Sequence, residues 1–210
     1  MNKKLFILCF IFLTSIYALK NFDSNIVNAF RAKYGLKATK KLTYLDKIMQ
    51  KAKKAKTIRK LKYINDFFNS IQYQSDIKHW GVKDYWATPL EFLGSGAGDC
   101  EDYAIAKYFT LIKVGIKENK LRIAYVKLLR KRTRYEEAHM VLLYFHKPNS
   151  TPIVLDNVIK RLKLATKRKD LKLIYSFNAN GLWKAKNKGR TQKKVGANKL
   201  SKWKNLVNKI

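Results

Sequence analysis

Residues 94–109 read GSGAGDCEDYAIAKYF, a glycine-rich stretch that passes directly into a helical pattern. Asp99 suits an N-cap and Gly115 suits a C-terminal stop, so we expect a helix between them that runs to about Val114. The intervening residues are apolar over most of the helix circumference, which predicts a largely buried central helix. Cys100 then lies in the first turn of this helix.

Cys100 is open to three interpretations: a buried structural thiol, a metal ligand or a nucleophile. A lone cysteine in a helix is commonly a small core residue, and 2 cysteines and 3 histidines are too few for a structural zinc site. The first turn of a helix also stabilises a thiolate, because its free N–H groups and the helix dipole favour negative charge. The same N–H groups can hold the oxyanion of an acyl-transfer intermediate, which suits a nucleophile.

The composition is globular, with a very large excess of positive charge. The chain has 210 residues, of which 47% are hydrophobic, enough for one domain with a substantial core. It carries 46 Lys and Arg against 14 Asp and Glu, a formal net charge of +32. The positive electrostatic potential of such a chain favours an anionic partner, namely nucleic acid, a membrane surface or an acidic protein.

Residues 1–18 have the pattern of a secretory signal peptide. Lys3 and Lys4 precede an apolar run at 5–13, and Ala18 offers a cleavage point. This run is too short to span a bilayer, so we expect an exported protein with no stable membrane insertion after cleavage. Export argues against a nucleic-acid partner, and it leaves Cys100 as the only cysteine, with no partner for an internal disulfide.

The order of hydrophobic patterns along the rest of the chain predicts an α+β fold. Residues 19–60 form a basic helical segment, in which Ser24 can cap a first helix and Gly35 can stop it. Residues 61–210 form the main domain. Its strand-like runs are 121–129, 139–146 and 152–159. It ends in a basic amphipathic helix whose apolar face is made by Leu200, Trp203, Val207 and Ile210.

A cysteine nucleophile needs a base, and the base needs a group that orients it. His139 opens a strand-like run, His146 faces the other side of that run, and His79 lies in an irregular aromatic segment. Tight antiparallel pairing of the neighbouring runs would place Asp156 beside His139. The pattern predicts a Cys100–His139–Asp156 triad, with a surface histidine and a turn aspartate as the simpler alternatives.

The acidic residues around Cys100 pose a problem for this chemistry. Asp99, Glu101 and Asp102 in a first helical turn are ordinary matches to the helix dipole. Beside a thiolate, however, they raise the pKa of the thiol and repel a developing oxyanion. A hard cation held by Asp99 and Glu101 would remove the conflict, and calcium prefers such oxygen ligands, although no EF-hand loop is present.

Several long motifs, in order over roughly residues 60–207, resemble the periplasmic proteases of the bacterial transglutaminase-like cysteine proteinase family. The motifs are HWGVKDYWATPLEFLGSGAGDCEDYAIAKYF, LRIAYVKLL, AHMVLLYF, VLDNVI, LIYSFNANGLW and KVGANKLSKWKNLV. The resemblance implies a papain-like, transglutaminase-type fold, with the nucleophile at the N-terminus of a central helix packed on an antiparallel sheet.

The resemblance also implies roles for individual residues. The nucleophile falls on the cysteine of GDCEDYA, Cys100; the base falls on the histidine of AHMV, His139; the orienting acid falls on the aspartate of VLDN, Asp156. The family is calcium-dependent, and its acidic residues beside the nucleophile match Asp99 and Glu101. Calcium is therefore the cofactor that the resemblance implies.

For function, the resemblance implies a periplasmic endopeptidase that cuts the N-terminal retention region of a large RTX-type surface adhesin at a paired-alanine site. Cleavage would release the adhesin and promote biofilm dispersal. The implied second partner is the periplasmic domain of an inner-membrane receptor that senses cyclic di-GMP. Small residues on both sides of the cut suit a narrow cleft, and we expect Trp86 and Gly98 to border it.

Two other functions compete with peptide hydrolysis. The first keeps the fold and transfers the acyl group to an amine, as transglutaminases do. The second is a non-enzymatic basic module that binds an acidic polymer or a membrane surface, with binding that falls steeply with salt. An exported chain with one cysteine and an ordered set of triad residues favours an enzyme over this module.

Overall fold

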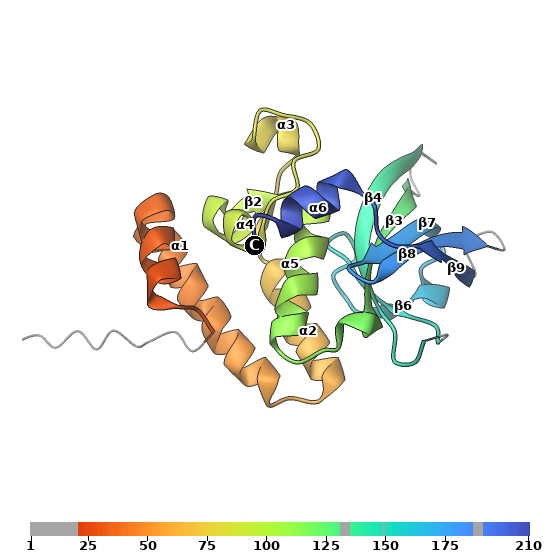
Figure 1. The fold of residues 1–210 in the computed structure, drawn as a ribbon, viewed down its shortest axis with the longest axis horizontal. Helices are drawn as coiled ribbons and strands as arrows, with labels where there is room; N and C mark the ends of the chain where they lie inside the picture. The colour runs from red at the N-terminus through yellow and green to blue at the C-terminus, as the bar shows by residue number, and fades with distance from the viewer. Residues whose placement is uncertain (1–20, 131–134, 149, 187–190) are drawn as a thin grey trace, which may run out of the picture.

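The computed structural model describes residues 21–130, 135–148, 150–186 and 191–210. A group of helices lies on one side and a sheet on the other, with one helix buried between them (Figure 1). The fold is therefore the predicted α+β arrangement. The predicted signal peptide, residues 1–18, lies outside the described residues, and the division at residue 60 stays a prediction.

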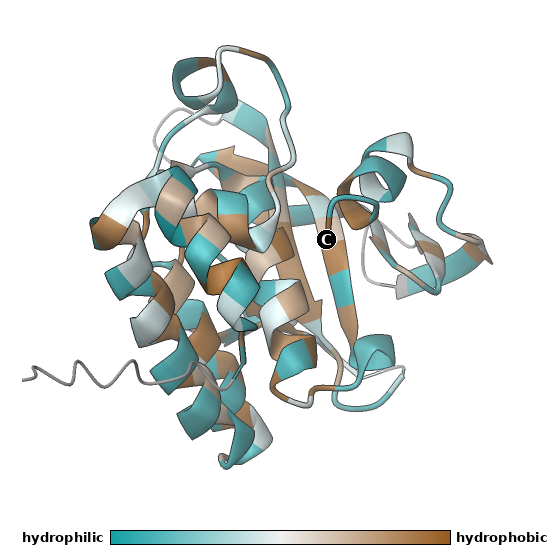
Figure 2. Cartoon of the chain, turned by 60° about the vertical axis from the view of Figure 1, so that its left-hand side comes forward, coloured by the Kyte–Doolittle hydropathy of each residue, from teal (hydrophilic) through white to brown (hydrophobic). Residues whose placement is uncertain are grey.

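The first two helices form a hairpin at the edge of the helical group (Figure 1). Helix α1 spans Ser24–Lys53 and helix α2 spans Thr57–Phe68. Gly35 breaks the helical geometry with a φ of 77°, as expected for the predicted stop, but the chain resumes its helix directly afterwards. Hydrophobic residues alternate with hydrophilic ones along the helices at the front of Figure 2, as expected when one face is buried.

Short elements connect the hairpin to the central helix. They are strand β1 (Gln72–Tyr73), helix α3 (Asp76–His79), helix α4 (Pro89–Ser95) and strand β2 (Ala97–Gly98), and β1 pairs with β2 in parallel. Helix α4 begins with a capping box, because Thr88 Oγ1 accepts from Glu91 N at 3.2 Å and Glu91 Oε2 accepts from Thr88 N at 2.8 Å. The glycine-rich stretch forms the last turn of this helix and its C-cap, Gly96, which has a φ of 80°.

Helix α5, Cys100–Lys113, is the buried centre of the molecule. Ile105, Tyr108 and Leu111 are completely buried, and the helix packs against α2, α4 and strands of the sheet. Gly115 follows its end with a φ of 91°. The prediction of a central helix with Cys100 in its first turn is confirmed, because nearly every face of α5 has a packing partner.

The main sheet is antiparallel and has seven strands in the order β6-β5-β4-β3-β7-β8-β9. The strands are β3 (Leu121–Arg130), β4 (Tyr135–Tyr144), β5 (Ile153–Leu155), β6 (Lys163–Leu164), β7 (Leu171–Asn178), β8 (Gly181–Lys186) and β9 (Thr191–Gly196). Two 3-10 helices, Glu118–Lys120 and Ala165–Lys167, precede β3 and follow β6.

Strand β4 begins earlier than the sequence pattern indicates. His139 was expected to open the strand, but it lies in the middle of β4 and pairs with Val126 of β3. The polar residues before it stay in the sheet because cross-strand ion pairs hold them. Lys127 Nζ lies 2.9 Å from Glu136 Oε2, and Arg130 Nη2 lies 2.5 Å from Glu137 Oε1.

Helix α6, Ser201–Val207, packs against α5 at Tyr108 and Phe109. Trp203 is buried and stacks on Phe109, with ring centroids 5.6 Å apart. The predicted apolar face is wrong at its end: Leu206 is buried, whereas Val207 is 43% exposed. The helix ends at Val207, before Ile210, the last residue of the predicted apolar face. No helix in the described part of the chain is both long and apolar enough to cross a membrane.

We expect Trp203→Ala to lower the free energy of unfolding by about 3–5 kcal/mol, because it leaves a large cavity between α6 and α5. The matched control, Val207→Ala on the same helix, should change it by less than about 0.5 kcal/mol, since this side chain is largely exposed. Denaturant unfolding of both variants measures the difference. Equal effects would show that α6 is not anchored through Trp203.

Candidate active site

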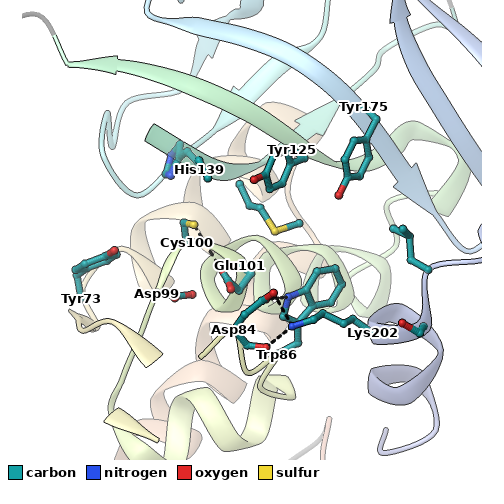
Figure 3. Close-up of a pocket in the computed structure, with 14 residues that line it drawn as sticks. Tyr73, Asp84, Trp86, Asp99, Cys100, Glu101, Tyr125, His139, Tyr175 and Lys202 are labelled. Atoms are coloured by element: carbon teal, nitrogen blue, oxygen red, sulfur yellow. Dashed lines mark hydrogen bonds and ion pairs between the residues drawn. The ribbon is translucent and has the colours of Figure 1, made fainter. Parts of the chain in front are cut away.

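A cavity of about 540 Å³ opens at the N-terminus of α5. It is bordered by the start of α5, by strands β3, β4 and β7, and by the chain that leads into α6 (Figure 3). The lining residues include Tyr73, Asp84, Trp86, Asp99, Cys100, Glu101, Tyr125, His139, Met140, Tyr175 and Lys202. Cys100 and His139 lie next to each other in this cavity, and Asp99 and Glu101 lie on the side of Cys100 away from His139 (Figure 3).

Cys100 is the first residue of α5, and its side chain is half-buried. Its thiol donates to Glu101 Oε2 at 3.1 Å. Burial raises the pKa of this thiol well above its usual value, and the charges of Glu101 and Asp99 raise it further. A hydrogen bond from the Met140 backbone N–H acts in the opposite direction. Without a counter-ion for the acids, the thiol is therefore held in its protonated form.

His139 and Asp156 form a buried pair beside Cys100. His139 Nε2 lies 2.8 Å from Asp156 Oδ1, and the two residues are 4% and 1% exposed. Their proximity follows from the register of β4 and β5, in which Leu142 pairs with Leu155, because Asp156 comes directly after β5 ends. Among the described residues, no strand pairs with residues 135–141 of β4 on that side, so the contact between His139 and Asp156 lies just beyond the paired region.

Arg168 is a further partner of Asp156 that the sequence reasoning missed. Its Nη2 lies 2.7 Å from Asp156 Oδ2 and 2.7 Å from Asp170 Oδ2, and the residue is 2% exposed. Burial raises the pKa of Asp156, but the hydrogen bond and charge of His139, together with Arg168, outweigh it and hold the pKa well below its usual value. Among 46 cationic residues, nothing in the sequence distinguished this arginine.

The structure brings Asp99 and Glu101 together with two further carboxylates. Possible ligand atoms of Asp99, Cys100 and Glu101 lie within 4.8 Å of one another, and so do those of Asp76, Asp99 and Asp102. Asp76, from α3, was not predicted, because it is 23 residues before Asp99 in the sequence and no spacing pattern joins them. Asp102 was predicted only as a match to the helix dipole. It also accepts from Ala87 N at 2.9 Å and from Asp99 N at 3.2 Å.

This acidic cluster fits a hard cation. Burial, followed by the charges of neighbouring carboxylates, raises the pKa of Asp102 to about 8 and that of Asp76 to about 6. Burial and the adjacent Glu101 raise the pKa of Asp99 to about 8. Within the described residues, Asp76 Oδ1 and Asp99 Oδ1 are buried without a hydrogen-bond partner. These two oxygens, among carboxylates whose burial and mutual repulsion disfavour the charged form, would suit a calcium ion, which binds carboxylate oxygens and offsets their negative charge.

The two residues expected to border the substrate cleft lie in different places. Trp86 lines the cavity, and its ring also stacks on Phe177 with centroids 5.8 Å apart. Gly98 is buried behind the acidic cluster and is not among the residues that line the cavity. A Cβ at this position would contact the Asp102 carboxylate and would lie 2.6 Å from the Phe92 ring. Close packing therefore explains this glycine.

Three tyrosines of the cavity wall were not predicted. Tyr73 comes from β1, Tyr125 from β3 and Tyr175 from β7, and the rings of Tyr125 and Tyr175 stack with centroids 5.3 Å apart. Opposite them, Lys202 of α6 forms an ion pair with Asp84 at 2.6 Å. These residues come from distant parts of the sequence, so only the sheet register and the docking of α6 bring them together.

A cysteine at the start of a buried helix, beside a histidine–aspartate pair on an antiparallel sheet, fits the transglutaminase-like class of cysteine enzymes. A family model described as bacterial transglutaminase-like cysteine proteinase matches residues 37–185. The chain belongs to this family.

Solved structures agree with this assignment. Calcium-bound LapG of Legionella pneumophila is 36% identical to this chain; the match covers 90% of this chain and 99% of that one, with a TM-score of 0.75. The EGTA-treated form of LapG matches at 36% identity over 90% of this chain and 97% of that one, with a TM-score of 0.76. The comparison with curated proteins finds no match.

We expect calcium to stabilise the protein more at pH 7.5 than at pH 5. A carboxyl group whose pKa is raised to about 8, as in Asp99 and Asp102, stabilises the calcium-free fold at low pH and loses that effect as the pH rises through 8. Calcium must displace these protons, so its apparent affinity falls with pH. At 100-fold excess over Kd, the stabilisation is about 2.7 kcal/mol.

Thermal unfolding in calcium and in EGTA, at both pH values, measures this effect without an activity assay. Magnesium is the control, since it prefers tighter octahedral geometry and retains its waters. An equal calcium-dependent shift in Tm at both pH values would contradict binding by these carboxylates.

Proposed function

We propose that this proteinase is a calcium-dependent periplasmic cysteine endopeptidase of the LapG type, with Cys100, His139 and Asp156 as its triad. One observation carries the proposal: the Cys100 thiol and the His139 ring, which is bonded to Asp156, line one cavity beside an acidic cluster. The similarity to LapG, whose structure is known with calcium, supports the same reading.

The contact with Asp156 supports a separate role for each nitrogen of His139. Nε2 is bonded to Asp156 Oδ1, so Nδ1 is the nitrogen left to take the proton of Cys100. The thiolate then attacks the scissile carbonyl carbon, and the free N–H groups of the first turn of α5 hold the oxyanion. His139 returns its proton to the leaving amine, and water, activated by the same histidine, hydrolyses the thioester.

Asp156 supports the imidazolium form of His139 during both steps. Its carboxylate stays ionised because His139, Val158 N and Arg168 all contact it in a buried site. Asp99 and Glu101 would hold the calcium, with Asp102 and Asp76 close by. The ion, when bound, supplies positive charge that offsets the carboxylates which raise the pKa of Cys100.

We propose a large RTX-type surface adhesin as the substrate, cut in its N-terminal retention region between paired alanines. The walls of the cleft are bulky rings from Tyr73, Trp86, Tyr125 and Tyr175, which leave space for small side chains next to the scissile bond. Release of the adhesin would promote biofilm dispersal. The proposed regulator is the periplasmic domain of a cyclic di-GMP-sensing inner-membrane receptor, which would sequester the protease.

Export to the periplasm rests on the signal-like pattern of residues 1–18. An acyl transferase of the same fold would use the same triad and differ only in the acceptor, so its products would be cross-linked chains. A basic binding module would not need Cys100 at all. Membership of a proteinase family argues against that module.

We expect Cys100→Ala to reduce cleavage of a candidate adhesin retention segment by about 10⁴-fold or more, because no other group replaces the nucleophile. His139→Ala should behave similarly. His146→Ala is the matched control, since this histidine is exposed and lies outside the cavity. Mass spectrometry of the products separates hydrolysis, which yields two fragments, from acyl transfer. Cleavage by Cys100→Ala at the wild-type rate would end the proposal.

We expect EGTA to abolish cleavage and added calcium to restore it in the wild-type protein. Asp99→Asn should behave like the chelated enzyme and fail to respond to calcium, because asparagine can still cap α5 but lacks the charge. Asp66→Asn, at an exposed ion pair with Lys62, is the control and should keep the wild-type response. An Asp99→Asn protein with full calcium-dependent activity would exclude Asp99 as a ligand.

A further inference from the structure

A completely buried lysine lies in the middle of the nucleophile helix. Lys107 of α5 is 0% exposed, and within the described residues no carboxylate lies at ion-pair distance from its ammonium. Its hydrogen bond goes to Asn69 Oδ1 at 2.7 Å. Burying an ammonium against a neutral amide is unfavourable, and an apolar side chain of similar volume would fill the same space at lower cost.

Asn69, at the C-terminal cap of α2, connects this lysine to the segment that carries Asp156. Its Nδ2 donates to the backbone carbonyl oxygen of Asp156 at 2.8 Å. The backbone carbonyl oxygen of Asn69 accepts from Lys160 Nζ at 3.0 Å. The ammonium can only donate, so Asn69 Oδ1 must face Lys107 and the amide nitrogen must face Asp156. Lys107 therefore sets the orientation of the Asn69 side chain.

The result is a chain of hydrogen bonds from α5 to the catalytic base. It runs from Lys107 through Asn69 to the backbone of Asp156, whose carboxylate holds His139. Lys107 comes seven residues after Cys100, about two helical turns, so both lie on one face of the same helix. The positions of the nucleophile and of the base are thus both fixed relative to α5.

We propose that Lys107 and Asn69 are positioning residues, which hold Asp156 and through it His139 in register with Cys100. The inference rests on the triad proposed above. The backbone of Asp156 follows a strand of only three residues, Ile153–Leu155, so the sheet alone anchors it weakly on that side. A second bond between the same segments, from Asn65 Nδ2 to the Lys160 carbonyl at 2.7 Å, strengthens the attachment of α2.

The electrostatics agree with this geometry. Burial lowers the pKa of Lys107 to about 7, and the nearby charges of Asp156 and Asp66 oppose that effect whereas Lys160 adds to it. The side chain also lies beside the ring of Tyr103, with Nζ 5.7 Å from the ring centroid. A neutral amine can still donate to Asn69 Oδ1, while the Asp156 carbonyl, which only accepts, keeps Asn69 Nδ2 turned toward it.

Lys107→Met in the calcium-loaded protein tests the inference. Methionine keeps most of the volume and removes the donor, so we expect kcat to fall about 10- to 100-fold while KM changes less than about twofold. Lys113→Met is the matched control, because it makes the same change at an exposed position in the last turn of the same helix. It should leave both constants unchanged.

Asn69→Asp is a second variant that keeps the partner of Lys107. The carboxylate still accepts from the ammonium but cannot donate to the Asp156 carbonyl, so kcat should fall as in Lys107→Met while Tm stays close to wild type. If Lys107 acts through Asn69, the double variant should be no slower than the slower single variant. Should Lys107→Met fail to fold, Asn69→Asp decides the question.

Alkylation of Cys100 by iodoacetamide gives a readout that needs no peptide substrate. We expect both variants to react about tenfold more slowly than wild type, because a misplaced His139 accepts the thiol proton less well. The inference would be overturned if Lys107→Met and Asn69→Asp kept the wild-type kcat and alkylation rate. It would also be overturned if Lys113→Met lost as much kcat and alkylation rate as they do. Failure of the wild-type protein to cut the retention segment would instead contradict the proposed substrate, and alkylation would still test Lys107.

Discussion

The burial of α5 is the constraint on which the rest of this structure depends. The helix is packed on nearly every side, between α2 and α4 on one side and the sheet on the other, and its N-terminus opens into the cavity. Cys100 is therefore presented at the opening of a cavity while its helix is held rigidly. The same end offers free N–H groups, which is where acyl-transfer chemistry needs them.

Negative charge is concentrated at this one point of a very basic chain. Formal charge would lead one to expect cations near every carboxylate, yet Asp76, Glu101 and Asp102 are buried, and Asp99 half-buried, in one cluster at the start of α5. The pKa values of Asp99 and Asp102, raised to about 8, are the direct consequence. A cation would offset the repulsion within this cluster, and the similar protein LapG is known in a calcium-bound form.

The opposite arrangement holds Asp156. Its pKa is held well below the usual value because His139, Arg168 and a backbone N–H contact it in the interior. The acidic cluster and Asp156 lie in the same domain, yet their carboxyl groups have opposite tendencies to ionise. Their neighbours, and not their residue type, decide this difference. The acidic cluster suits a metal ion, and Asp156 suits the base that we propose for His139.

The sequence by itself determined the α+β class, the central helix with Cys100 in its first turn, and the strands that carry His139 and precede Asp156, because these follow from local hydrophobic periodicity and capping. Only the tertiary structure decided the early start of β4, the burial of Leu206 in place of Val207, and the placing of Gly98 behind the acidic cluster. It also brought Asp76 to the acidic cluster, Arg168 to Asp156, and Asn69 between Lys107 and Asp156. Each of these depends on contacts between segments distant in the chain, which no local pattern encodes.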